Sequence, residues 1–144
     1  MNKILLFLFL FSIILLPYHS FSVNASSLKD YPTGIHTYYV TPNKLTNMTL
    51  IKTSANYWEN YGYHLKYSKI NPEVIITLNN ICNGDIMGSF NKTSHVINIY
   101  TYCIVHDSQY RFTEQVLEHE LGHFLGFEHT ADLKIMHPEI DYPS

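Results

Sequence analysis

The chain has 144 residues, a formal net charge of −3 and charged side chains at 15% of its positions. It has no basic stripe of the kind that binds phosphate backbones, so the composition argues against nucleic acid as a partner. The length allows one compact domain with a single core but not two. The sequence contains no internal repeats or linkers, which also favours one domain.

The N-terminal segment has the pattern of a signal peptide. Lys3 precedes a predominantly apolar run over residues 4–16, which is too short for a comfortable membrane span. Compact side chains at the end of residues 1–25 predict cleavage after Ala25, which leaves a mature domain of residues 26–144. The mature protein is then secreted, without stable membrane insertion. The alternative is an uncleaved signal anchor that tethers the protein to a membrane.

The next part of the chain alternates between strand and helix patterns. A strand is predicted at 35–40, where Tyr and β-branched residues follow the turn residues 32–34. Apolar residues at helical spacing predict a helix over 47–60, and Gly62 lies just past its end. Further strands are predicted at 63–68, 74–78 and 95–102.

The chain contains two cysteines, Cys82 and Cys103. An exported protein meets an oxidising compartment, so a disulfide between them is expected. This bond would stabilise the domain by roughly 3 kcal/mol in the chain-entropy model. The alternative is a pair of buried thiols.

The last predicted helix begins at about Glu114 and ends near Gly126. Thr113 is a suitable N-cap for it, and Phe112 could pack on Leu117 as a hydrophobic staple. An apolar stripe would pack this helix against the sheet. The stripe consists of Val116, Leu117, Leu121, Phe124 and Leu125.

The same helix carries residues with the spacing of a catalytic zinc site. His119 and His123 lie one turn apart on one face, so their nitrogens can occupy adjacent corners of a tetrahedron. Glu120 sits about 100° round the helix from His119, which suits contact with a water rather than with the metal. Gly126 allows the chain to turn back so that His129 supplies a third ligand. The alternative, an amphipathic core helix with exposed histidines, leaves this order to coincidence.

The order His-Glu-x-x-His-x-x-Gly-x-x-His, followed by Met136, resembles that of the metzincin zinc proteases. Within this superfamily the chain is similar to the matrixins, because Thr130 follows the third His and Met136-His137-Pro138 resembles the matrixin Met-Tyr-Pro. The resemblance implies an α+β fold of the zincin type. Such a fold has a twisted, mainly parallel sheet, an active-site helix and a small C-terminal subdomain that carries a methionine turn.

The resemblance also implies roles for individual residues. Glu120 would act as general base and then general acid, and Met136 would form an apolar floor under one catalytic zinc ion. His137, next to Met136, is expected to point away from the metal. The resemblance leaves calcium and a second, structural zinc undecided. The implied zinc ligands are His119, His123 and His129.

A substrate path follows from the same resemblance. Residues 84–90 resemble the matrixin edge strand, to which a peptide in extended conformation can add by main-chain hydrogen bonds. The alternative is an ordinary irregular strand, because two glycines weaken strand propensity. The residues expected to contact substrate are Ile86, Gly88 and Phe90 in this segment, and Pro138 and Ile140 in the pocket beyond the scissile bond.

The predicted function is a secreted zinc-dependent endopeptidase that uses a zinc-activated water and Glu120 as general base. The partner would be a peptide or protein substrate. The rival is a secreted zinc-binding module with little or no turnover. An intact Glu120 argues against this rival, because binding alone does not need a base.

Overall fold

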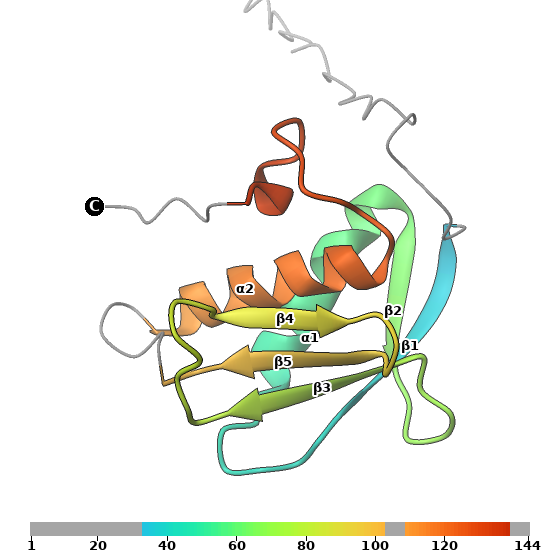
Figure 1. Cartoon of the computed structure of the whole chain (residues 1–144). Helices are drawn as coiled ribbons and strands as arrows, with labels where there is room; N and C mark the ends of the chain where they lie inside the picture. The colour runs from blue at the N-terminus through green and yellow to red at the C-terminus, as the bar shows by residue number, and fades with distance from the viewer. Residues whose placement is uncertain (1–32, 103–108, 139–144) are drawn as a thin grey trace, which may run out of the picture.

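A computed structural model describes residues 33–102 and 109–138, which form a five-stranded sheet with two helices against one of its faces (Figure 1). The predicted signal peptide, Cys103 and Ile140 lie outside the described residues. The signal peptide and the Cys82–Cys103 disulfide therefore stay predictions. Among the described helices, none is long and apolar enough to cross a membrane.

The sheet is mainly parallel, as predicted. Its strand order is β2-β1-β3-β5-β4. The first four strands in this order run parallel to their neighbours, whereas β4 pairs antiparallel with β5 and forms one edge. The bounds are β1 (Gly34–Val40), β2 (Tyr63–Tyr67), β3 (Val74–Asn79), β4 (Gly88–Asn91) and β5 (Val96–Tyr100).

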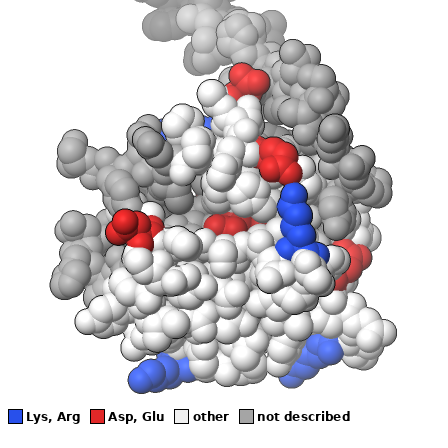
Figure 2. Space-filling model, in the orientation of Figure 1, with Lys and Arg blue, Asp and Glu red and all other residues white. Residues whose placement is uncertain are grey.

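Alternation of side chains gives the sheet a buried inner face and an open outer face. In β3 and β5 the residues Ile76, Ile97 and Ile99 are fully buried. Their neighbours Thr77 and Asn98 are partly exposed and face each other in the β3–β5 register. Figure 2 shows that the sheet surface turned to the viewer carries few charged side chains. The helices thus cover one face, and a period of two places the aliphatic residues there.

The first helix is capped at both ends. The helix α1 (Met48–Tyr57) begins after Asn47. The Asn47 side-chain oxygen accepts hydrogen bonds from the backbone N–H groups of Thr49 and Leu50. The 3-10 helix η2 (Trp58–Tyr61) continues it, so the predicted helix over 47–60 is confirmed with a tighter last turn. Gly62 ends it at a φ of +85°, a conformation that favours glycine.

The second helix, α2 (Gln109–Phe124), begins earlier than expected. Thr113 lies inside the helix, so its predicted role as N-cap is wrong. The physical reason is that the apolar stripe continues one turn upstream, because Phe112 is buried one helical turn before Val116. The predicted stripe itself is confirmed, since all five of its residues are buried.

The chain leaves α2 through a glycine turn and then folds back over the helix. Gly126 has a φ of +91°. The Phe127 N–H donates to the Gly122 carbonyl and the Gly126 N–H donates to the His123 carbonyl, at 2.9 and 3.1 Å. This pair of bonds is the Schellman motif, which reverses a chain at a helix end. The short 3-10 helix η3 (Lys134–Met136) follows.

Candidate metal centre

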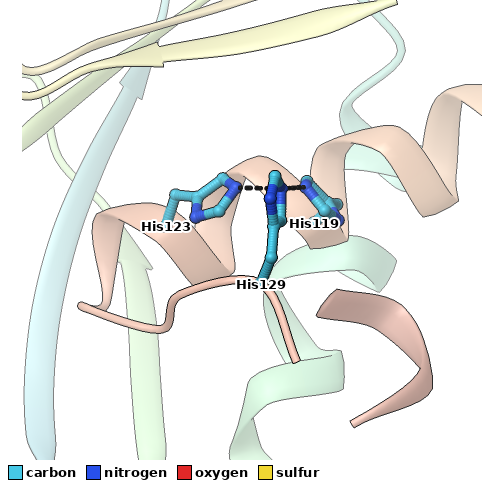
Figure 3. A group of neighbouring side chains, drawn as sticks. All are labelled: His119, His123 and His129. Atoms are coloured by element: carbon cyan, nitrogen blue, oxygen red, sulfur yellow. Dashed lines mark hydrogen bonds between the residues drawn. The ribbon is translucent and has the colours of Figure 1, made fainter. Parts of the chain in front are cut away.

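Three imidazoles converge where the chain returns over α2 (Figure 3). The Nε2 atoms of His119 and His123 each lie 3.2 Å from Nε2 of His129. The three ligand atoms all lie within 4.8 Å of one another, so the group could hold a metal ion. The turn at Gly126 makes this possible, because it brings an exposed loop residue opposite two residues of the helix.

Backbone carbonyls fix the orientation of the two helical imidazoles. His119 Nδ1 donates to the Ile135 carbonyl at 2.7 Å, and His123 Nδ1 donates to the Phe127 carbonyl at 2.9 Å. A carbonyl can only accept, so in both rings the proton sits on Nδ1 and Nε2 keeps its lone pair. This is the tautomer that a metal-binding histidine needs.

Two of the three nitrogen spacings match those around a tetrahedral zinc ion. Two nitrogens at zinc–nitrogen distances of about 2.0–2.1 Å and tetrahedral angles are about 3.3 Å apart. The 3.2 Å contacts of His129 with His119 and His123 agree with this spacing. Three imidazoles are also a donor set that zinc accepts in catalytic sites.

Burial keeps the helical imidazoles uncharged near neutral pH. It lowers the pKa of His119 to about 4, although the hydrogen bond to the Ile135 carbonyl opposes this shift. Burial also lowers the pKa of His123, against the hydrogen bond to the Phe127 carbonyl. Protons therefore compete weakly with a metal for both rings at physiological pH.

Glu120, which follows His119 on α2, lies buried under β4. Burial raises the pKa of Glu120 to about 7, and the backbone N–H of Phe90 opposes this rise by donating to the carboxylate. A carboxyl with a pKa near the operating pH can both take up and release a proton. Glu120 thus has the properties of a general base and acid beside the imidazoles.

Strand β4 passes over Glu120 as the free edge of the sheet. The Tyr100 N–H donates to the Met87 carbonyl at 2.8 Å, so these residues form a hydrogen-bonded antiparallel pair. In such a ladder the main-chain groups of alternate residues, here Gly88 and Phe90, point away from β5. The edge-strand prediction for residues 84–90 is therefore confirmed for residues 88–90, and β4 continues to Asn91.

Gly88 is constrained by its contact with Glu120. A Cβ at this position would lie 2.8 Å from Glu120 Oε1 and 2.6 Å from Val116 Cγ1. Both approaches are too close for a real side chain, so only glycine lets the edge lie directly on the carboxylate. The Phe90 ring faces inward, with its centroid 6.0 Å from that of Phe124. Phe90 can therefore meet substrate only through its main chain, whose N–H already donates to Glu120.

The remaining predicted substrate residues are Ile86, Pro138 and Ile140, of which Ile140 lies outside the described residues. Ile86 precedes β4, forms an isolated bridge with Asn83 and is 49% exposed. Pro138 is exposed at the end of the described segment. The substrate roles of both residues stay predictions, as does that of Ile140. His137 is not part of the imidazole group.

Met136 lies fully buried next to Gly122 and Trp58. A Cβ on Gly122 would overlap Met136 Sδ and would lie 2.7 Å from Trp58 Cζ2. The Trp58 ring nitrogen in turn donates to the Glu118 carbonyl of α2 at 3.0 Å. The packing role of Gly122 was not predicted from the sequence. A glycine inside the apolar face of a helix was the available signal, because it costs helix stability unless packing requires it.

Replacing Gly122 by alanine is expected to destabilise the protein by about 1–3 kcal/mol, because the added methyl overpacks the contact with Met136 and Trp58. In an ordinary helix the same change would stabilise by up to about 1 kcal/mol, so the sign is diagnostic. Denaturant unfolding measures it. Gln115→Ala, on a partly exposed face of α2, is the control and should shift stability by less than about 0.5 kcal/mol. A stabilising Gly122→Ala change would contradict the packing described above.

Comparison with solved structures finds a likeness to myroilysin. One myroilysin structure matches with a TM-score of 0.53 and 18% sequence identity, over 73% of this chain and 53% of that chain. A crystal structure of myroilysin matches with a TM-score of 0.53 and 19% identity, over 72% of this chain and 47% of that chain. The chain thus spans about half the length of the myroilysin chains it matches.

The sequence itself matches no model of a known protein family and no curated protein. The likeness to myroilysin therefore concerns the fold. Together with the observed sheet and helices, it confirms the predicted α+β, metzincin-like fold class. It does not distinguish the matrixins from other proteins of this fold.

Proposed function

We propose that the protein is a zinc-dependent endopeptidase that hydrolyses peptide bonds with Glu120 as general base. The observation that carries the proposal is the position of Glu120. Its buried carboxylate follows a metal-competent histidine on α2 and contacts the free edge of β4. One place thus combines a metal donor set, a proton acceptor and an edge to which an extended peptide can add.

In this mechanism, a zinc ion would be held by His119, His123 and His129. Zinc, when bound, lowers the pKa of a coordinated water and polarises the scissile carbonyl. Glu120 takes a proton from the attacking water as the new carbon–oxygen bond forms. It then delivers that proton to the leaving nitrogen as the carbon–nitrogen bond breaks, so it ends the cycle ionised.

The β4 edge would hold the substrate chain in register with Glu120. Gly88 and Phe90 present main-chain groups along this edge, which suits an extended peptide of varied sequence. The partners we propose are therefore peptides or unfolded segments of proteins. The rival function is zinc binding without turnover. It would not require a buried carboxylate beside the metal donors, and burying a carboxylate costs folding free energy.

Two finer assignments are also proposals. A matrixin-like character is supported by Thr130 after the third histidine and by the triplet Met136-His137-Pro138. Secretion is supported by the apolar run at residues 4–16, with membrane tethering through that run as the alternative. Neither assignment is needed for the chemistry proposed above.

Cleavage of casein or gelatin by the purified mature chain tests the proposed function. Activity should disappear on addition of a chelator and return when zinc is added back. The Glu120→Gln variant, treated in the same way, is the control for a contaminating protease and should stay inactive after zinc is restored. Cleavage that persists in the chelator, or that is equal in the variant, would count against the proposal.

A further inference from the structure

An ion pair joins the end of β4 to the loop that carries the third imidazole. Lys92 Nζ lies 3.0 Å from Glu128 Oε1, and Glu128 directly precedes His129. In Figure 1 the turn after β4 and the loop after α2 lie at the same end of the molecule. Figure 2 shows a shallow hollow between the sheet and the C-terminal segment, and on one side of it a basic side chain meets an acidic one.

The position of Lys92 follows from the strand before it. In β4 every second residue, here Gly88 and Phe90, points its main-chain N–H and C=O groups away from β5. Lys92 is the next residue in this series, just after the end of the strand. After Asn91 the backbone turns away from the edge. The Asn91 side-chain oxygen accepts hydrogen bonds from the amides of Thr93 and Ser94, at 2.9 and 3.0 Å, which fixes this turn. Lys92 is thereby held where the edge ends.

We propose that the Lys92–Glu128 pair sets the length of peptide that the cleft accepts on one side of the scissile bond. This inference rests on the proposed peptidase function. The edge of β4 is four residues long, about 13 Å, and Glu120 contacts it at Gly88 and Phe90, so the part between the scissile bond and the pair is shorter than the whole edge. A longer peptide must separate the two side chains or leave the sheet edge at this point.

The ion pair is weak, so it should reduce the cleavage of longer peptides rather than prevent it. The side chains of Lys92 and Glu128 are 69% and 74% exposed. An exposed pair of this kind changes an equilibrium by a factor of about two to five, and salt screens it. Peptides beyond the limit should therefore still be cleaved, but less efficiently.

Two peptide series test the inference. Both share one cleavable core, and they are lengthened by one residue at a time on the N-terminal or on the C-terminal side. For the wild-type protein, kcat/KM should fall about two- to fivefold in one series only, once the peptide extends past the Asn91 end of the edge. Lys92→Ala should remove this fall, and so should high salt with the wild-type protein.

Three controls accompany this experiment. Lys69→Ala removes an exposed lysine from the turn between β2 and β3 and should behave like the wild type. Glu128→Gln removes the other charge of the pair at constant size and should reproduce Lys92→Ala. Zinc content should be the same in all these variants, since none of the changed residues belongs to the imidazole group.

Binding of the same peptides to Glu120→Ala protein, measured by fluorescence of labelled peptides, separates this inference from turnover. Cleavage without a length effect, or with the same length effect in Lys92→Ala, overturns the inference and leaves the proposed function standing. Length-dependent binding that Lys92→Ala relieves, without any cleavage by the parent protein, supports the inference and overturns the peptidase. Absence of both binding and cleavage overturns both.

Discussion

Replacing Glu120 by alanine is expected to leave about one zinc ion bound per chain and to lower the rate of peptide hydrolysis ~100-fold or more. The two outcomes separate because the carboxylate is not one of the three metal donors. Its removal takes away the group that accepts and returns a proton, while the imidazoles and their carbonyl partners remain. Zinc analysis of the dialysed protein and peptide kinetics on the same sample measure both quantities.

Two further variants make this result specific. Glu120→Gln keeps an oxygen that can accept from the Phe90 N–H, so it should fold like the parent protein and be as inactive as Glu120→Ala. Glu59→Ala removes a half-exposed carboxylate in η2 and should leave activity unchanged. Near-normal hydrolysis by Glu120→Gln would refute the general-base role, even with zinc bound.

Much of the secondary structure could be predicted because it follows from local rules. Short runs of strand-favouring residues place β1, β2, β3 and β5 within two residues of their predicted ends. Gly62 and Gly126 were expected at helix ends, and both take a positive φ there. These features depend on neighbours in the sequence, so the sequence alone suffices to find them.

The start of α2 could not be placed in the same way. Thr113 satisfies the local preference for an N-cap, but Phe112 belongs to the buried stripe of the helix. Tertiary burial therefore outweighs the capping preference and extends the helix upstream. A local pattern offers no measure of that competition.

In the candidate site, too, some features follow from the local sequence and others depend on tertiary packing. The convergence of the three imidazoles could be predicted, because it depends only on their spacing along one helix and the turn that follows it. The contacts of Gly88 with Glu120, of Gly122 with Met136, and of Lys92 with Glu128 join segments far apart in the chain. Contacts of this kind depend on the packing of β4 and of the C-terminal segment against α2, which no periodicity encodes.

Removing one imidazole is expected to have a different consequence from removing Glu120. His123→Ala should lose both metal and activity, because two imidazoles hold zinc much more weakly than three. His123 also donates to the Phe127 carbonyl, so this variant perturbs the turn after α2 as well. His129→Ala is the second variant, since His129 is exposed and its loss should leave the fold intact.

His137→Ala is the matched control for these two changes. His137 lies one residue from Met136 but outside the group of three imidazoles, so the variant should keep about one zinc per chain. Zinc analysis after dialysis, with circular dichroism to confirm folding, distinguishes the variants. A folded His129→Ala protein that retains zinc, or a folded His137→Ala protein that loses it, would show that the metal has a different set of ligands. Joint loss of metal and activity in His123→Ala and His129→Ala, with His137→Ala unaffected, is the result that a three-imidazole centre requires.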